Sequence, residues 1–567
     1  MWKDEPPLEV VYRTGDQDYC VFHAPMSEKW TPDGRGLYPV DEFNALVFER
    51  IKFVIRNVEA EDKDVICNLR GTVFPGDISF TDFAEEHALP SLNLLDVTFC
   101  GKVKFTGAPF DGKADFSRVN FLGEASFTGA NFRSEAIFSM SMFKGNLDFS
   151  DAIFNSETTF SGAAFRGEVT FFNATMFKDR TFFNNTTFES KLRGMDVVFQ
   201  SEANFHEARF NGDVYFHEAM FGGQAYFRGS QFRDQAVFYR ASFVGEGVFR
   251  EILFGGETNF SFTRFGGNAD FSRANFSEKT RFVGADFSDV GHFDFAMFSR
   301  EVDFERSRWM DTSFAQARFG DLARFLWATF NQPVNFSGIH ANESAVQFHQ
   351  LSESSLSNLI FQEREIDYIS FKGCRTWPPT LKLESSPYHD YKACEALFRL
   401  LKRTADEEKN MQMVSDWHLK EKLMKLKALL ANEKSIDALD KFEDLNSSFC
   451  QRSWAWIKLF CFSPLIVKLR LTGLYWFSSG FGERPVRAFW VLAFLCALVL
   501  ALNAVPTPSW VPSLRTDDFA NATLAYIPFT KDIQGDGWIR FGRGLWQFLI
   551  AVQFTLFALA VRNRFRR

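Results

Sequence analysis

The chain has few cysteines, and none of them stand close together. Only eight cysteines occur in 567 residues, at positions 20, 67, 100, 374, 394, 450, 461 and 496. A secreted scaffold held by disulfides carries a dense and regular set of cysteines. The pattern therefore excludes such a scaffold and predicts free thiols in a reducing compartment.

The sequence also lacks the motifs of the common enzyme classes. It contains no His-Glu-x-x-His motif, no phosphate-binding loop and no nucleophile elbow. Cys20 and His23 have the spacing of two metal ligands, but no second pair follows at the distance of a zinc site, so we expect a packed strand there. Residues 206–207 and 217–218 are both His-Glu, and they look like copies of one outward position. We expect no enzymatic activity, no cofactor and no bound metal.

A strong net charge and a signal peptide are absent as well. The formal net charge of -8 is modest for this length, which argues against nucleic acid as a partner. Residues 1–7 lack the basic start and the apolar run of a signal peptide. We therefore expect the N-terminus to stay in the cytosol.

Phenylalanine, by contrast, is abundant and regularly spaced. The chain contains 72 phenylalanines. Between residues 102 and 348 they recur in alternating steps of five and six residues, so the pattern repeats every eleven residues. A small residue, most often alanine, stands two positions before many of them. Representative positions of this ladder are Phe116, Phe121, Phe127, Phe132, Phe138, Phe205, Phe210, Phe216, Phe221, Phe271 and Phe276.

This period predicts a β-solenoid. Residues i and i−2 of an extended chain face the same side, so each short strand points one small side chain and one ring inward. The period is too short for a solenoid of helix pairs, whose repeats have roughly 33 to 47 residues. An amphipathic helix with an eleven-residue repeat is disfavoured, because Gly, Thr, Asn and Phe are weak helix formers. Stacked coils bring the rings into register about 4.8 Å apart, where offset stacking is favourable.

Residues 114–118 (Ala-Asp-Phe-Ser-Arg) and 130–134 (Ala-Asn-Phe-Arg-Ser) resemble the repeats of the pentapeptide-repeat family. The family pattern is Ala, then Asp or Asn, then a large apolar residue and two variable positions. The resemblance implies a mainly β fold, a right-handed quadrilateral β-helix with four such segments per coil. This chain departs from the pattern by using Phe instead of Leu and by adding a sixth residue to every second segment. The departure suggests about 22 residues per coil and about eleven coils.

We expect both ends of the solenoid, residues 96–350, to be covered, because an open end exposes strand edges that invite aggregation. Residues 1–95 are expected to form the N-terminal cap, with strand-like pieces at 46–55 and 64–69. The serine-rich residues 351–390 are expected to form a second cap and a linker.

From residue 391 onward the pattern becomes helical. Apolar residues at helical spacing in 391–446 predict two amphipathic helices that pair as a hairpin, with a junction near Asn410. Residues 399–402 (Arg-Leu-Leu-Lys) are similar to the start of a helical piece that links solenoid and membrane in membrane-bound pentapeptide-repeat proteins. Residues 447–482 are aromatic and apolar with scattered Lys and Arg, which predicts an interfacial amphipathic helix.

Residues 483–567 predict a two-helix transmembrane hairpin. Its apolar runs, 488–505 and 545–561, lie near the lower length limit for crossing a bilayer. Basic residues are densest at the C-terminus, so the positive-inside rule places both ends of the hairpin in the cytoplasm. We therefore expect a multi-pass protein of a bacterial cell membrane, with the N-terminus, the solenoid and the C-terminus cytoplasmic.

These features predict a non-enzymatic scaffold that is tethered to the lipid bilayer. Its rod would bind an unknown cytoplasmic protein, and the chain could act as an oligomer. The alternative is a subunit of a channel or transport system, because two helices joined by a loop are the minimal potassium-channel plan. The loop at 506–540 lacks the Thr-Val-Gly-Tyr-Gly filter. In the channel hypothesis Gln547 and Gln553 are the candidate pore-lining residues; otherwise they form hydrogen bonds between helices.

Overall fold

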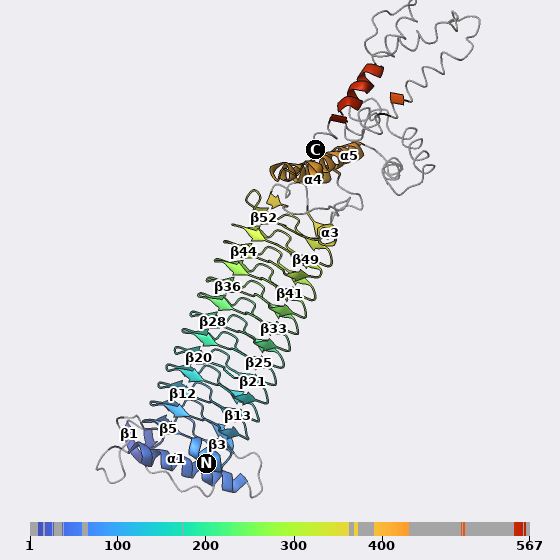
Figure 1. The fold of residues 1–567 in the computed structure, drawn as a ribbon. Helices are drawn as coiled ribbons and strands as arrows, with labels where there is room; N and C mark the ends of the chain where they lie inside the picture. The colour runs from blue at the N-terminus through green and yellow to red at the C-terminus, as the bar shows by residue number, and fades with distance from the viewer. Residues whose placement is uncertain are drawn as a thin grey trace, which may run out of the picture. The chain divides into compact units, whose positions relative to one another are not determined.

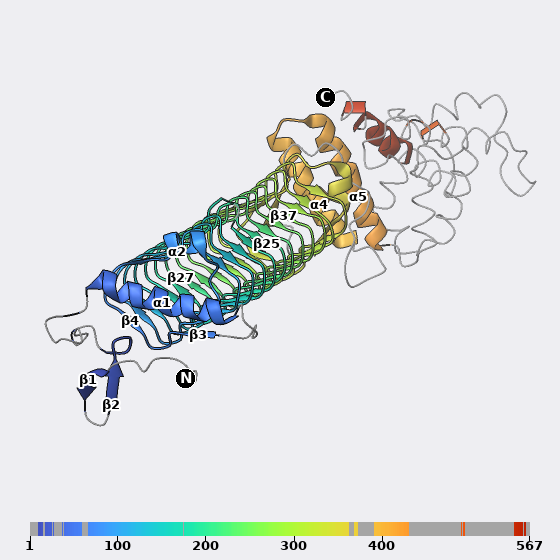
Figure 2. The same ribbon diagram turned by 90° about the horizontal axis from the view of Figure 1, so that it is seen from below.

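The structure consists of two compact units, Met1–Glu384 and Ser385–Arg567. The computed structural model describes residues 10–14, 17–24, 27, 37, 39–58, 66–173, 175–361, 368–371, 391–429, 489, 492–493, 549–559 and 561–562. The first unit is a stack of coils with a helical cap at its N-terminal end (Figures 1 and 2).

Four parallel β-sheets form the four sides of the solenoid. One coil holds β10 (Ala114–Asp115), β11 (Asn120–Phe121), β12 (Ala125–Ser126) and β13 (Asn131–Phe132), one strand on each side. Sheet 1 contains β10 and has 14 strands, from β3 (Ile66–Asn68) to β53 (Leu359–Ile360), and sheet 2 contains β11 and has 13 strands, from β4 (Val73–Phe74) to β51 (His340–Ala341). Sheet 3 contains β12 and has 14 strands, from β5 (Ile78–Ser79) to β54 (Ile369–Ser370). Sheet 4 contains β13 and has 11 strands, from β9 (Pro109–Phe110) to β49 (Thr329–Phe330). The expected quadrilateral solenoid is therefore present, and its handedness stays a prediction.

The coil length matches the sequence prediction. Ala114 of β10 lies opposite Ala136 of β14 (Ala136–Ile137), one coil of 22 residues later. The Phe171-Phe172 doublet interrupts the ladder because the coil there holds one extra residue, so that Ile153 lies opposite Met176. Between β7 (Thr98–Phe99) and β52 (Val346–Gln347) every strand has two residues, so each side of a coil is short.

Phenylalanine rings fill the interior of the tube. Phe116 stacks on Phe138 of the next coil, with ring centroids 4.8 Å apart, and meets Phe127 of its own coil edge-on at 5.5 Å. Each buried ring contributes roughly 1.5 to 3 kcal/mol, so the columns supply the core by themselves. This gain is largely offset by the entropy of ordering so many turns.

Two kinds of corner explain the alternating steps of five and six residues. After sheets 1 and 3 the chain makes a tight turn, such as the one in which Val119 N–H donates to Phe116 O at 3.3 Å. The third residue of such a turn has positive φ, as in Arg118 with φ 54°. Counted between the inward residues, a corner after sheet 1 or 3 holds two residues, such as 117–118, and a corner after sheet 2 or 4 holds three, such as 122–124. There the backbones of neighbouring coils pass closely, and a Cβ on Gly123 would lie 2.5 Å from Gly101 O.

A helix covers the N-terminal end of the core. The helix α1 (Val40–Val58) lies across the first coil (Figure 2). Phe43 meets Phe74 edge-on at 5.7 Å, and Phe48 meets Phe80 at 5.3 Å. The prediction of a strand at 46–55 is wrong, because the buried positions, Phe43, Val47, Ile51 and Val54, follow a helical period.

The sheets extend beyond 96–350 at both ends. On sheet 1 the inward positions before residue 96 are filled by Cys67 and Leu69, and then by Leu92 and Leu94, so the phenylalanine pattern is incomplete in these coils although Phe74 and Phe80 fill the other sides. The helix α2 (Thr81–Glu86) is inserted into the first coil and lengthens it. At the other end α3 (Glu353–Ser357) precedes β53 in the same way, and the remaining first-unit strands, β1 (Val10–Thr14) and β2 (Gln17–Cys20), form an antiparallel hairpin.

The described part of the second unit is mainly a helical hairpin. The helices α4 (Tyr391–Glu407) and α5 (Met411–Leu429) pack against each other, and Asn410 accepts a hydrogen bond from Met413 N–H at the start of α5. Residues 430–446 of the predicted hairpin lie outside the described residues.

Glu421 is a charged group in this helix pair. Its side chain is only 5% exposed, and it accepts from Lys402 at 2.6 Å and from Arg399 at 3.4 Å. Burial by itself raises the pKa of the Glu421 carboxyl. The hydrogen bond from Lys402 and the charges of Lys422 and Lys402 outweigh that effect, so the pKa lies below its ordinary value.

The described residues contain no helix that is both long enough and apolar enough to cross a bilayer. Residues 549–559 are helical. The predicted interfacial helix, 447–482, and nearly all of the predicted span 488–505 lie outside the described residues. The transmembrane hairpin therefore stays a prediction from the sequence.

Candidate interaction surface

The ladder residues named from the sequence all lie in the core. Phe116, Phe138, Phe205 and Phe271 belong to sheet 1, Phe121, Phe210 and Phe276 to sheet 2, Phe127 and Phe216 to sheet 3, and Phe132 and Phe221 to sheet 4. None of these side chains is more than 1% exposed. They hold the coils in register, and any functional group must be sought among the outward residues.

The tight corners form two columns of outward residues with positive φ. The column between sheets 1 and 2 includes Arg118, Met140 and Phe295, and the column between sheets 3 and 4 includes Phe262 and Trp327. Several positions in both columns are glycine, as Gly284 is, which adopts this backbone without strain. For other residues it costs about 1 to 2 kcal/mol.

Three large aromatic rings stand exposed at these strained positions. Phe262, Phe295 and Trp327 have φ values of 58°, 58° and 52°, and their side chains are 54%, 57% and 45% exposed. Arg273 lies over the Phe295 ring at 5.7 Å, and Arg306 lies over the Trp327 ring at 5.0 Å. Neither the core nor the turn requires a ring at these corners. We name these three residues the corner aromatics.

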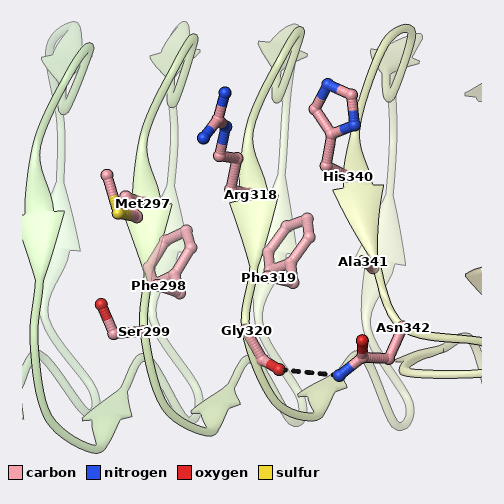
Figure 3. Close-up of a pocket in the computed structure, with 9 residues that line it drawn as sticks. All are labelled: Met297, Phe298, Ser299, Arg318, Phe319, Gly320, His340, Ala341 and Asn342. Atoms are coloured by element: carbon pink, nitrogen blue, oxygen red, sulfur yellow. Dashed lines mark hydrogen bonds between the residues drawn. The ribbon is translucent and has the colours of Figure 1, made fainter.

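Around Phe295 the surface is apolar and cationic. Met297, Arg318 and His340 project outward from three neighbouring strands of sheet 2, β43 (Met297–Phe298), β47 (Arg318–Phe319) and β51, and all three side chains are exposed (Figure 3). They line an open hollow of about 420 Å³. We name Arg273, Phe295, Met297, Arg318 and His340 the sheet 2 patch.

Small residues and a hydrogen bond form the side of the hollow at the corner. Ser299, Gly320 and Asn342 succeed one another along the coils, and the Asn342 side-chain amide donates to Gly320 O at 3.0 Å (Figure 3). Glycine is needed here, since a Cβ on Gly320 would lie 2.5 Å from Ser299 O. The absence of a side chain at Gly320 keeps the hollow open beside Arg318.

Many charged side chains on the solenoid pair with the coil above or below. Arg118 donates to Asp96 through two nitrogens, both at 2.7 Å, and this hydrogen bonding lowers the pKa of the Asp96 carboxyl. Arg133 pairs with Asp111 at 2.7 Å in the same manner. Arg273 and Arg318 differ, because neither forms an ion pair with any residue that the structure describes. Two guanidinium groups of the sheet 2 patch are therefore open to an anionic partner.

The His-Glu sequences occupy equivalent outward corners. Glu207 and Glu218 are the positive-φ residues of opposite columns, and Glu218 pairs with Arg240 at 3.2 Å. The structure does not bring His206 and His217 together, because they lie at different corners. Within the described ranges no group of three His, Cys, Asp or Glu side chains could hold a metal ion.

The two candidate pore residues cannot be compared as a pair. Gln553 lies in the helical residues 549–559 and is buried, and Gln547 lies outside the described residues.

The corner aromatics were not identified from the sequence, although the sequence contains a signal for them. Each stands two positions after a ladder residue, where the turn normally places a small or polar side chain.

Comparison with known families agrees with this architecture. The model of the family "Pentapeptide repeats" matches residues 105–153 and 183–231, with nine copies of the repeat. No curated protein and no solved structure matches the chain. Both matched stretches lie within the four sheets. These two stretches of the solenoid therefore match pentapeptide repeats, in agreement with the resemblance in the sequence.

Proposed function

We propose that the protein is a non-enzymatic scaffold whose solenoid binds a cytoplasmic protein and whose C-terminal region tethers it to a lipid bilayer. The corner aromatics carry the proposal. Each exposes a ring to water and holds a backbone conformation that glycine would adopt at lower cost. They contribute nothing to the core, and the contacts of two rings with Arg273 and Arg306 offset only part of the cost, so a partner that covers the rings would recover the rest.

The composition of the sheet 2 patch suggests the chemistry of the partner. Aromatic side chains, Met and Arg are enriched where protein interfaces gain their binding energy. Arg273 and Arg318 would pair with carboxylates, while Phe295 and Met297 would contact apolar side chains. A protein segment that carries acidic and apolar residues side by side fits this surface.

The tether rests on the sequence of the last part of the chain. Two apolar runs, 488–505 and 545–561, are flanked by arginines, which suits a hairpin with both ends in the cytoplasm. Membrane flotation of the full chain tests this proposal against a shortened chain that ends at residue 482. The full chain should float with lipid and the shortened chain should not. Equal behaviour of the two would remove the tether from the proposal.

Photocrosslinking tests the binding surface in native membranes. A benzophenone amino acid at position 295 should capture one discrete protein. The matched control is position 140, because Met140 stands in the same corner column, has φ 58° and is 69% exposed. Capture should also disappear when Arg318→Glu reverses the charge at position 318, because the new carboxylate cancels the charge of Arg273. Equal labelling from positions 140 and 295, or labelling that survives the charge reversal, would rule out this surface.

A further inference from the structure

Cys20 and His23 form a hydrogen-bonded pair at the N-terminal end of the first unit. Cys20 is the last residue of β2, and the chain turns back directly after it, because His23 N–H and Ala24 N–H donate to Cys20 O at 3.0 and 2.9 Å. This turn brings His23 Nδ1 to 3.0 Å from Cys20 Sγ. The thiol is half-buried and the imidazole is exposed.

The first coil of the solenoid holds the imidazole in place. His23 Nε2 lies 2.8 Å from Arg70 O, and since a carbonyl oxygen only accepts, Nε2 carries a hydrogen. The ring also packs against Gly71, where a Cβ would lie 3.3 Å from His23 Cδ2. With Nε2 engaged in this way, Nδ1 faces the sulfur and can accept its proton.

The surroundings of the sulfur favour the thiolate. Burial by itself raises the pKa of the Cys20 thiol. The hydrogen bond with His23, the charge of His23 and hydrogen bonds from the backbone of His23 and Phe22 outweigh burial, so the pKa lies below its ordinary value. Among the described residues no third His, Cys, Asp or Glu side chain joins the pair into a group that could hold a metal ion.

We infer that Cys20 is a nucleophilic thiol that exchanges with small disulfides, and that His23 is its base. The pair has the three parts of an activated nucleophile, namely a nucleophile, a base within hydrogen-bond reach and a group that orients the base. This modification site lies outside the corner columns and does not depend on the proposed function.

The exchange is balanced in atoms and electrons. His23 Nδ1 accepts the thiol proton, and the Cys20 thiolate attacks one sulfur of the small disulfide. A new sulfur–sulfur bond forms as the old one breaks, and the leaving thiolate takes the proton from His23. The products are a mixed disulfide on Cys20 and one small thiol. Formation of the mixed disulfide also removes the thiol proton, so the hydrogen bond between Cys20 and His23 is lost.

The rate of this reaction in the folded protein tests the inference without any substitution. Full-length protein is treated with oxidised glutathione at pH 7, where an ordinary thiol is only a few per cent ionised. Peptide mass spectrometry follows the mixed disulfide at Cys20 in native and in urea-unfolded protein. We expect Cys20 to react about ten-fold faster in the native state. A half-buried thiol with only a structural role would react more slowly when folded, and that result would overturn the inference.

A variant then tests the part played by His23. His23→Asn keeps a polar side chain but removes the base, and Cys20 should lose its native-state acceleration. Hydrogen exchange of residues 66–80 reports whether the first coil stays folded in this variant. Acceleration that persists in His23→Asn would reject His23 as the base. Cys67 serves as an internal reference, because it is buried and should react only after unfolding.

Discussion

Removal of one ring from the middle of the core should weaken the solenoid locally. Phe238 is fully buried, stacks on Phe216 at 5.5 Å and on Phe260 at 4.8 Å, and meets Phe227 edge-on at 5.9 Å. Phe238→Ala loses these contacts and leaves a cavity, which typically costs about 3 to 5 kcal/mol. The coils above and below cannot close the cavity, because the hydrogen bonds of four sheets fix their spacing.

The loss should be confined to a few coils. Each coil touches only its neighbours, so stability spreads along a solenoid through nearest-neighbour interfaces. Hydrogen exchange of the full chain measures this directly, since amide protection reports the free energy of local opening. Amides of residues 225–260 should lose protection in Phe238→Ala, while those of residues 114–148 should keep it.

The matched control is Phe262→Ala, because Phe262 belongs to the neighbouring coil but stands at the exposed corner. This change should alter protection by no more than about 0.5 kcal/mol. Similar losses of amide protection in the two variants, or an equal loss along the whole solenoid, would refute the conclusion that the inward phenylalanine rings supply the stability of the solenoid.

Three further changes probe a buried charge, a corner and a surface ion pair. Glu421→Gln should destabilise the α4–α5 hairpin by about 1.5 to 3 kcal/mol, the value of a hydrogen bond to a charged group, as measured by exchange of residues 391–425. Because the folded-state pKa of the Glu421 carboxyl is lowered, this carboxyl stabilises the hairpin fully above the ordinary pKa of 4.5. The stabilisation is lost as the pH falls through the folded-state pKa, and the variant should lack this acid sensitivity. Gly284→Ala should destabilise the solenoid more than Gly107→Ala in the same column. Both glycines have positive φ, but only at Gly284 would the new Cβ meet a ring, that of Phe262 at 2.8 Å. Equal losses of amide protection by hydrogen exchange would contradict this. Arg118→Ala should cost less than about 1 kcal/mol, because the pair with Asp96 is exposed, and a larger loss of protection in the first coils would show that the charge ladder is structural.

The core could be read from the sequence because its signal is periodic. Phe116 and Phe138 repeat the same local context one coil apart, so spacing alone predicts that they stack. The first coils were missed, because Cys67 and Leu92 fill the same inward positions without the aromatic pattern. Helix α1 was read as a strand since its residues are β-branched and aromatic, although their burial follows a helical period.

The surface could not be predicted in the same way. Phe295 belongs to no ladder, and only the position of the tight turn shows that its ring must point outward with a strained backbone. The hollow beside Arg318 depends on three residues from three coils, which the sequence separates by about one coil each. The hydrogen bond of His23 to Arg70 O likewise joins segments that no local pattern relates.

The half-coil symmetry of the repeat leads to a last prediction. The segments that begin at Ala225 and Ala236 bury their inward residues at the same positions, 225, 227, 230 and 232 in one and 236, 238, 241 and 243 in the other, although they belong to sheets 1 and 3. Deletion of residues 225–246 removes one full coil and should leave every downstream face in its column, because Ala225 and Gly247 are already partners in sheet 1. Deletion of residues 225–235 removes half a coil. The ladder then stays continuous, but everything downstream should turn to the opposite side of the rod.

Engineered cysteines distinguish the two deletions. In the intact chain Glu218 and Arg240 are neighbours in one corner column, so cysteines at these positions should form a disulfide across adjacent coils, whose backbones lie about 4.8 Å apart. In the half-coil deletion Arg240 moves into the other column, directly after Glu207, and the disulfide should form between positions 207 and 240 instead. If the shortened chain kept the 218–240 disulfide, or failed to fold, the corners rather than the phenylalanine columns would determine how coils stack. If the partner moves, the columns alone set the fold, and the outward residues are free to specify what the solenoid binds.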